Sequence, residues 1–464
     1  MINDNILYSS DSYKLGHFLQ LPPNTTSIYS YLESRGGLYP ETVFFGLQYL
    51  LKKYLTTRIT PDMVHEMAGF SKLHGLAFNT SGWLDLATRL EGKIPLRIRA
   101  VAEGSVVPTH NILMSVENTD PAMPWATTYF ETLLMRIWYP ITVATISWHC
   151  RKTILSYLEK TSDDPMSEIN FKLHCFGSRG VSSQESAEIG GAAHLVNFMG
   201  SDTLNGIWAA NQYYDCAMAA FSIPAAEHST ITSWGQCHEV DAFRNMLNQF
   251  AKPGALVAVV SDSYDLWNAI DNLWGHELKQ QVIDSGATLI VRPDSGEPAK
   301  IVLESLTRLE RAFGSTVNRK GFKVLNHVRV IQGDGINPDT IAEILHDVTH
   351  AGFSATNIAF GMGGALLQHC NRDTQKFAYK CSSIIVDGEE RDVFKDPVTD
   401  PGKRSKAGRL DLIKHSNRYE TVRLPHNQNS QLVPVFENGE ILQTYTLDQV
   451  RERAKMHEAK VLVS

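Results

Sequence analysis

The chain has 464 residues, of which 43% are hydrophobic and 20% are charged, and its formal net charge is −7 at pH 7. These values are typical of a globular protein, and a chain of this length is expected to fold as two structural units. The negative net charge argues against a general nucleic-acid binder, because binding to the phosphate backbone needs a broad basic surface.

The cysteines and the N-terminal residues indicate the cellular compartment in which the protein is expected. The six cysteines are scattered, with neither CxxC pairs nor metal-ligand spacing, which is typical of free thiols in a reducing environment. The first residues, MINDNILYSSDSYK, lack a basic segment followed by an apolar one, so no secretory signal is expected. No stretch approaches the roughly 20 apolar residues of a membrane span. We therefore expect a soluble, cytoplasmic protein.

The N-terminal third mixes short strands and helices. Leu96 and Ile98 alternate with Arg97 and Arg99, which is the period of a half-buried strand. The mostly apolar run 125–138 has the length of a helix, and we expect Pro140 to close it.

Four short apolar runs in the middle of the chain each stop at polar or glycine residues, and a stretch of helical character follows each. The runs are 255–260, 288–291, 328–331 and 358–360, and they continue into SDS, RPDSG, QGDG and GMGG, respectively. Continuous apolar runs predict strands buried on both faces, as in a parallel sheet with helical crossovers. Their spacing of about 30 residues favours a β/α barrel.

In such barrels the chemistry lies at the carboxyl ends of the strands. Glycines there let backbone N–H groups approach a phosphate. Carboxylates there suit sugar hydroxyls, a magnesium ion or positive charge on a sugar ring, although a single aspartate more often caps the following helix. The residues expected at this mouth are Asp262, Asp265, Arg292, Asp294, Asp334, Gly363 and Gly364.

Two further features are ambiguous from the residues alone. His228 lies in the stretch AAEHST, where a neutral imidazole could act as base, ligand or nucleophile, but a single histidine is more often structural. A basic stretch that includes Lys395 and Lys403 contains interleaved aspartates and prolines. This mixture favours a specific anion site over a polybasic tail.

The C-terminal 60 to 70 residues change character again. Residues 433–442 predict a hairpin around Asn438 and Gly439, because Asn-Gly supplies the positive φ angles of a tight turn. A capped helix is expected to begin near Thr446. We expect these residues to complete the N-terminal domain. The predicted division is a mixed domain of 1–145 plus 385–464 and an inserted barrel domain of 146–384.

Long strings along nearly the whole chain match one known family in the same order. They are DSYKLGH (11–17), ETVFFGLQYL (41–50), WYPITVAT (138–145), GVSSQESAEIG (180–190), PAAEHSTIT (224–232), VVSDSYD (259–265), RPDSG (292–296), VIQGDG (330–335) and FKDPVTDPGKRSK (394–406). On these motifs the sequence resembles the nicotinamide phosphoribosyltransferase family. The resemblance implies a type II phosphoribosyltransferase fold, in which an incomplete β/α barrel is inserted in a mixed α+β domain, and a homodimer.

The resemblance also implies how the substrates bind. The nicotinamide ring is expected to stack between Phe176 and Tyr13 of the second subunit, with Asp202 reading the carboxamide. Nicotinate would bring a second negative charge to Asp202, so this carboxylate is expected to select nicotinamide. Other implied substrate contacts are Arg179, Ser261, Asp265, Arg292, Asp294, Gly333, Asp334, Gly363, Gly364 and Arg372. The implied pyrophosphate and phosphate contacts, partly made across the dimer, are Arg35, Lys380, Lys395 and Lys403.

The implied reaction is displacement at the anomeric carbon of phosphoribosyl pyrophosphate. The pyridine nitrogen attacks, pyrophosphate leaves with Mg²⁺, and carboxylates such as Asp294 stabilise an oxocarbenium-like transition state. His228 matches the histidine that the co-substrate ATP phosphorylates, and Glu227 is expected to orient its imidazole. The implied role is NAD salvage.

The sequence departs from the family beside the pocket, and other functions were weighed. Cys175 and Ser178 stand where vertebrate members have Asp and Tyr, although Phe176 and Arg179 match. The nearest alternative is a nicotinate phosphoribosyltransferase, against which Asp202 argues. A non-catalytic binding protein has no use for a phosphorylatable histidine. A barrel lyase or aldolase usually needs a Schiff-base lysine at a strand end, and none ends the four predicted strands.

Overall fold

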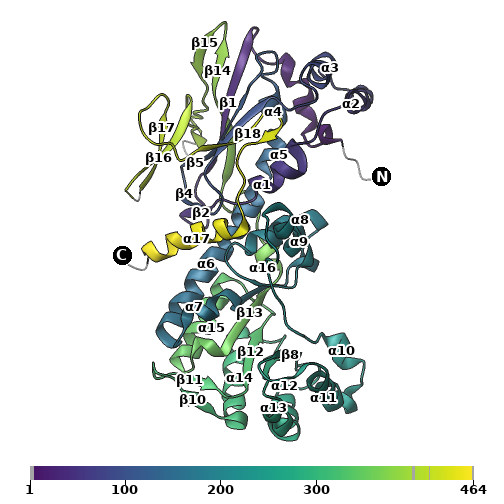
Figure 1. Ribbon diagram of the computed structural model, residues 1–464, viewed down its shortest axis with the longest axis vertical. Helices are drawn as coiled ribbons and strands as arrows, with labels where there is room; N and C mark the ends of the chain where they lie inside the picture. Colours follow the sequence, from purple (N-terminus) through teal and green to yellow (C-terminus); the bar gives the residue numbers. More distant parts are fainter. Residues whose placement is uncertain (1–4, 400–402, 417, 462–464) are drawn as a thin grey trace. The chain divides into compact units, whose positions relative to one another are not determined.

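The computed structural model describes residues 5–399, 403–416 and 418–461 (Figure 1). The chain forms two compact units. Unit 1 comprises Met1–Thr145, Gln212–Cys216 and Asn371–Ser464, and unit 2 comprises Ile146–Asn211 and Ala217–Cys370. The expected boundary at 384 needs correction, because Phe377–Val386 is a strand of the unit 1 sheet. In the described part of the chain, no helix is long and apolar enough to cross a membrane.

Unit 1 is built on a seven-stranded antiparallel sheet. In spatial order its strands are β15 (Glu389–Asp392), β14 (Phe377–Val386), β1 (Thr25–Ser34), β5 (Ile112–Asn118), β3 (Leu96–Ala100), β18 (Val433–Glu437) and β19 (Glu440–Ile441). Shorter antiparallel pairings join β2 (Glu41–Val43) to β4 (Val106–Pro108) and β16 (Leu410–His415) to β17 (Arg418–Arg423). The alternation predicted for β3 is confirmed, because Leu96 and Ile98 are buried and Arg97 and Arg99 are partly exposed.

The predicted C-terminal hairpin and capped helix are confirmed. β18 and β19 meet at Asn438 and Gly439, whose φ angles are 50° and 80°. Thr446 and Gln449 exchange hydrogen bonds between side chain and backbone, a capping box that begins α17 (Leu447–Val461). The pairing of β18 with β3 joins this hairpin to the main sheet of unit 1.

The apolar run 125–138 differs from its prediction. It forms the short helices α4 (Ala126–Tyr129) and α5 (Glu131–Met135) and then enters α6 (Trp138–Thr161), which runs from unit 1 into unit 2. Pro140 does not close a helix but lies in the first turn of α6, where a proline removes no helical hydrogen bond. The other α-helices of unit 1 are α1 (Leu47–Leu50), α2 (Pro61–His74) and α3 (Thr80–Arg89).

Unit 2 contains a six-stranded parallel sheet, as expected for an incomplete β/α barrel. In spatial order its strands are β7 (Gly200–Ser201), β6 (Leu173–Cys175), β13 (Ile358–Met362), β12 (Val328–Gln332), β9 (Thr288–Arg292) and β8 (Leu256–Val260). The four predicted strands are confirmed as β8, β9, β12 and β13. The strands β6 and β7 are too short to give a clear sequence pattern.

Helices follow most of these strands, and in Figure 1 α14 and α15 lie together beside β12. The α-helices of unit 2 after α6 are α7 (Pro165–Glu168), α8 (Gln184–His194), α9 (Leu204–Tyr213), α10 (His228–Thr232), α11 (Glu239–Phe250), α12 (Leu266–Asn268), α13 (Lys279–Ser285), α14 (Pro298–Phe313), α15 (Pro338–His350) and α16 (Gly364–Leu367). A small hairpin of β10 (Ser315–Val317) and β11 (Lys323–Leu325) lies between α14 and β12 in the sequence.

Residues 221–226, here called the closing segment, contact both edges of the parallel sheet. Phe221 forms a parallel bridge with Gly200 of β7, and Ala225 forms one with Ala258 of β8. An apolar cluster of Ala258, Ile290 and Ile331 packs against Phe176, Ile223 and Ala359. The sheet and the closing segment therefore share a filled core, as in other small barrels.

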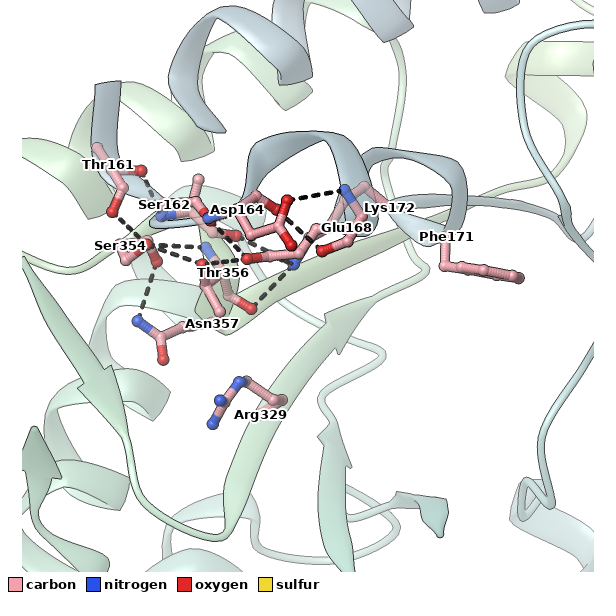
Figure 2. Close-up of polar contacts among 12 residues, drawn as sticks. Thr161, Ser162, Asp164, Glu168, Phe171, Lys172, Arg329, Ser354, Thr356 and Asn357 are labelled. Carbon is pink, nitrogen blue, oxygen red and sulfur yellow. Dashed lines mark hydrogen bonds and ion pairs between the residues drawn. The ribbon is translucent and has the colours of Figure 1, made fainter. Parts of the chain in front are cut away.

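The amino end of the sheet carries a polar network (Figure 2). The ammonium group of Lys172 lies 3.0 Å from Oε2 of Glu168 and donates to the carbonyl oxygen of Thr356 at 2.9 Å. Oε1 of Glu168 accepts hydrogen bonds from the hydroxyl groups of Ser162 and Thr356, at 2.6 Å and 2.9 Å. These contacts fix α7 against the residues that precede β6 and β13. This end of a barrel usually serves stability, and the chemistry lies at the other.

Candidate functional site

A cavity of about 610 Å³ lies at the carboxyl ends of the parallel strands, a volume suited to a small-molecule site. Loops after β6, β7, β9 and β12 contribute to it, together with the residues that follow the closing segment. Its lining residues are Phe176, Ser178, Arg179, Asp202, Thr203, Glu227, His228, Arg292, Asp294, Gly333 and Asp334.

The ring of Phe176 lies between the barrel core and the cavity. Its backbone N–H donates to the carbonyl oxygen of Met362 at 3.0 Å, which continues the pairing of β6 with β13. A Cβ atom on Gly361 would lie 1.9 Å from Cε2 of this ring, so only glycine allows the ring to lie across β13. The neighbouring Gly333 is also close, since a Cβ there would lie 3.5 Å from the same atom.

Asp202 presents an exposed carboxylate immediately after β7. Its backbone N–H donates to the carbonyl oxygen of Cys175 at 3.0 Å, and its Oδ1 accepts a hydrogen bond from the hydroxyl of Ser222. Burial lowers the pKa of nearby His174, although the charge of Asp202 acts in the opposite direction. His174 is therefore neutral near pH 7 and does not compensate the negative charge of Asp202.

His228 is held between two carboxylates. It is the first residue of α10, and its Nε2 lies 2.9 Å from Oδ1 of Asp262, while its Nδ1 lies 3.8 Å from Oδ2 of Asp294. Oδ2 of Asp262 accepts from the backbone N–H of Asp294 at 2.9 Å and from the hydroxyl of Ser295. Burial acts to raise the pKa of Asp262, but the hydrogen bonds from Ser295, His228 and Asp294 outweigh burial and lower it. Asp262 is therefore an ionised partner that orients the imidazole.

Each arginine of the cavity faces a carboxylate. Arg292 lies 3.6 Å from Asp294, and Arg179 donates to Glu227 at 3.2 Å. Burial raises the pKa of Asp294, with Arg292 acting against this and Asp262 adding to it. Glu227 is the N-cap residue of α10, where it accepts a hydrogen bond from the hydroxyl of Ser229 at 2.7 Å. The cavity therefore combines cations for an anionic substrate with carboxylates for a developing positive charge.

Some predicted residues do not line this cavity. Ser261 is fully buried, and its hydroxyl donates to the carbonyl oxygen of Val259 and accepts from the indole N–H of Trp274, at 3.0 Å and 3.1 Å. Asp265 caps α12 by accepting from two backbone N–H groups, at 3.0 Å each. Neither residue lines the cavity, and their contact with the substrate stays a prediction. Gly363 and Gly364 follow β13 at the same end of the sheet, outside the cavity lining.

The remaining predicted residues belong to unit 1. Tyr13 lies on a short 3₁₀ helix (Ser12–Leu19), and the residue is 60% exposed. Burial lowers the pKa of Lys380; Glu131 opposes this, and the charges of three predicted neighbours lower it further. These neighbours are Arg35, Lys395 and Arg372. Grouped, partly buried cations of this kind favour an anion site. Lys403 is exposed, and residues 400–402 of the FKDPVTDPGKRSK motif lie outside the described residues.

Comparisons with known proteins show the family of the chain. Residues 171–440 match the nicotinate phosphoribosyltransferase (NAPRTase) family, and residues 5–98 match the N-terminal domain of nicotinamide phosphoribosyltransferase. A protein of Xanthomonas campestris pv. campestris (strain 8004) named nicotinamide phosphoribosyltransferase is 54% identical over 459 residues, which cover 97% of this chain and 98% of that protein. The chain belongs to the nicotinamide phosphoribosyltransferase family.

Solved structures confirm the fold predicted for a member of the nicotinamide phosphoribosyltransferase family. The nicotinate-nucleotide pyrophosphorylase of Pyrococcus furiosus has a TM-score of 0.63 at 15% identity, over 100% of this chain and 98% of that chain. Human nicotinic acid phosphoribosyltransferase has a TM-score of 0.57 at 16% identity, over 97% of this chain and 92% of that chain. The chain is thus a phosphoribosyltransferase with the type II fold.

Three contacts of this family member were not assigned from its sequence. Ser222 bonds Asp202, Ser295 bonds Asp262, and Asp262 rather than Glu227 bonds the imidazole of His228. The sequence already places Asp262 at the carboxyl end of a predicted strand, where site residues are expected. Ser222 lies in a stretch that carries no periodic pattern and no turn motif, so nothing in the sequence marked it.

Proposed function

We propose that this enzyme transfers the phosphoribosyl group of phosphoribosyl pyrophosphate to nicotinamide, giving nicotinamide mononucleotide and pyrophosphate for NAD salvage. The observation that carries the proposal is the exposed carboxylate of Asp202, which forms no ion pair with another described residue, at the cavity that Phe176 lines. A carboxylate accepts the N–H of a carboxamide, whereas it repels the carboxylate of nicotinate. The name of the Xanthomonas relative supports the same acceptor.

The aromatic ring is proposed to lie on Phe176. Offset stacking of an electron-poor pyridine needs a flat aromatic face, and the glycine at position 361 allows the Phe176 ring to lie across β13. Asp202, which follows the neighbouring strand β7, would then hydrogen-bond the ring substituent.

The Gly361→Ala variant tests this arrangement. The added Cβ would occupy the place of the Phe176 ring, so the ring must move. We expect the KM for nicotinamide to rise about 5- to 150-fold, because a stacked base contributes about 1–3 kcal/mol. Steady-state kinetics measure this, with Gly69→Ala on α2 as the control, since a Cβ at position 69 has nothing within 4 Å. A normal KM in Gly361→Ala would place the ring elsewhere.

In the proposed reaction the ring nitrogen of nicotinamide attacks the anomeric carbon, and the bond from this carbon to the pyrophosphate oxygen breaks. The electron pair of that bond leaves with pyrophosphate, so positive charge develops on the ribose ring. Asp294 and Asp334 line the cavity and are proposed to bind the ribose hydroxyl groups and to stabilise this charge. Arg179 and Arg292 are proposed to hold the phosphate of the ribose. Gly333, Gly363 and Gly364 are proposed to offer backbone N–H groups to phosphate oxygens.

Mg²⁺ is proposed to accompany the pyrophosphate group. It usually binds through one or two carboxylates together with substrate phosphates, and Asp294 and Asp334 fit that chemistry. Bound there, the ion would supply charge neutralisation of the leaving group.

ATP hydrolysis is proposed to proceed through His228. Asp262 hydrogen-bonds Nε2 of the imidazole, which leaves Nδ1 as the nucleophile toward the γ-phosphate of ATP. The P–O bond to ADP breaks as the P–N bond to His228 forms, and water later hydrolyses the phosphohistidine. Glu227 pairs with Arg179 and is proposed to position this phosphate-binding arginine at the cavity.

The unit 1 residues are proposed to act across a homodimer. Tyr13 of the second subunit would cover the other face of the nicotinamide ring. Arg35, Arg372, Lys380, Lys395 and Lys403 would bind pyrophosphate and nucleotide phosphates, which suits the grouping of the cations around Lys380. We place the enzyme in the cytoplasm, because the six cysteines are free thiols.

Mixed dimers test the shared site. Tyr13→Ala and Phe176→Ala homodimers should each lose activity, because each site lacks one aromatic face. After denaturation and refolding of an equal mixture, half of the dimers are hybrids with one intact site, so activity should recover to about a quarter of the wild-type value. The measurement is the rate of mononucleotide formation before and after mixing. Absence of recovery, with hybrid dimers detected by native mass spectrometry, would contradict a shared site.

Product analysis tests the function itself. The purified protein is incubated with nicotinamide, phosphoribosyl pyrophosphate and Mg²⁺, with and without ATP, and the products are identified by mass spectrometry. We expect nicotinamide mononucleotide and an equal amount of pyrophosphate. A protein that binds both substrates and forms neither product would refute the proposal.

A further inference from the structure

Ser222 is a polar residue beside the site to which the proposed reaction assigns no role. It lies in the closing segment, and its hydroxyl donates a hydrogen bond to Oδ1 of Asp202. Among the described residues, the other oxygen, Oδ2, accepts no such hydrogen bond from the protein. The two oxygens of this carboxylate are therefore not equivalent, since one is engaged by the protein and the other is open to a ligand.

The backbone on both sides of Ser222 is fixed. The N–H of Phe221 donates to the carbonyl oxygen of Met199 at 2.8 Å, and the N–H of Ser201 donates to the carbonyl oxygen of Phe221 at 3.3 Å. These bonds tie the residue before Ser222 to β7, whose last residue precedes Asp202. The hydroxyl and the carboxylate therefore project from two backbone segments that are bonded to each other.

The closing segment is also fixed at its other end. Ala258 of β8 donates its N–H to the carbonyl oxygen of Pro224 and accepts from the N–H of Ala226, both at 2.9 Å. Ile223, the residue after Ser222, packs against the barrel core. A segment held at both ends and packed in the middle fixes the backbone position of Ser222, whose exposed side chain is held by its hydrogen bond to Asp202.

We infer that Ser222 is a positioning residue, which fixes the carboxylate of Asp202 so that its free oxygen faces the ring substituent and enforces selection of the amide over the acid. The inference rests on the proposed function, because it assumes that Asp202 reads this substituent. A hydrogen bond from a hydroxyl to a carboxylate is strong and directional, so it opposes rotation of the side chain. Without it, Asp202 can turn away, which weakens amide binding and relieves the repulsion of nicotinate.

The test compares Ser222→Ala with Ser222→Thr, which keeps the hydroxyl. Ser222→Ala should raise the KM for nicotinamide about tenfold, the effect of one hydrogen bond to a charged group, with kcat within about twofold. The KM for phosphoribosyl pyrophosphate should stay unchanged, and the preference for nicotinamide over nicotinate should fall. Ser222→Thr should restore most of the affinity. Ser167→Ala serves as the control, because Ser167 is an exposed residue of α7 at the opposite end of the barrel.

A double-mutant cycle separates positioning from a general structural effect. If Ser222 acts through Asp202, then Ser222→Ala should change the KM for nicotinamide less than twofold in an Asp202→Ala background. A tenfold effect that persists in that background would overturn the inference, as would a Ser222→Ala enzyme with a wild-type KM. Both results differ from failure of the proposed function, in which the wild-type enzyme does not use nicotinamide at all.

Discussion

Replacing Asp202 by alanine should lower kcat/KM for nicotinamide by about 10- to 100-fold, while kcat/KM for nicotinate stays level or rises. The loss corresponds to one hydrogen bond to a charged group, about 1.5–3 kcal/mol. Nicotinate makes no such bond, and removal of Asp202 also removes the repulsion between two negative charges. Because His174 is neutral near pH 7, its imidazole adds no charge that would mask this change.

The measurement is a set of initial rates with each acceptor at saturating phosphoribosyl pyrophosphate. Asp284→Ala is a matched control, because Asp284 is an exposed aspartate on α13 whose contact is with Gln280 of the same helix. A variant that keeps the full preference of the wild type for the amide would show that position 202 does not select the substrate.

Replacing His228 by alanine should abolish ATP hydrolysis, with a loss of at least about 1,000-fold, because the nucleophile is gone. Transfer of the phosphoribosyl group should continue at a lower rate, since its attacking atom belongs to nicotinamide. The arrangement that leads to this expectation is the 2.9 Å hydrogen bond between His228 and Asp262, which orients the imidazole in the cavity that Arg179 and Arg292 also line.

ADP release and the acid-labile label left by γ-³²P-ATP measure this directly. His238→Ala is the control, because His238 is an exposed histidine just before α11 that pairs with Asp241. ATP turnover at the wild-type rate in His228→Ala would rule out a phosphohistidine at this position.

The barrel strands could be predicted where the chain is apolar without interruption. The runs that became β8, β9, β12 and β13 are buried on both faces, so each gives a continuous signal. The strands β6 and β7 have three and two residues, and the closing segment joins both sheet edges through single bridges. Such short elements depend on their neighbours for pairing, so the local sequence carries little information about them.

Side-chain direction limited the prediction of the site. Ser261 and Asp262 are adjacent at the end of β8, but successive residues of a strand point to opposite faces. Asp262 therefore reaches His228, whereas Ser261 points into the core and bonds Trp274. The sequence placed both at the correct end of the sheet, and only the register of the folded strand distinguishes them.

Some site residues could be assigned only from the resemblance to the family, because hydrophobic periodicity does not distinguish them. Tyr13 has no pattern that separates it from an ordinary surface aromatic, and its proposed role needs a second subunit. Among the cations around Lys380, Arg35 is distant in sequence and becomes a neighbour because β14 and β1 pair, with Tyr31 opposite Lys380. Neither hydrophobic periodicity nor a family motif marks Ser222, and its contact with Asp202 follows only from the position of the closing segment.

A competition assay tests the central claim most directly. The wild-type enzyme receives equal concentrations of nicotinamide and nicotinate with limiting phosphoribosyl pyrophosphate, Mg²⁺ and ATP, and the two mononucleotides are separated and quantified. The account predicts that nicotinamide mononucleotide exceeds nicotinate mononucleotide by at least about 100-fold, since the acid would place two carboxylates together. Nicotinate mononucleotide as the main product would contradict it.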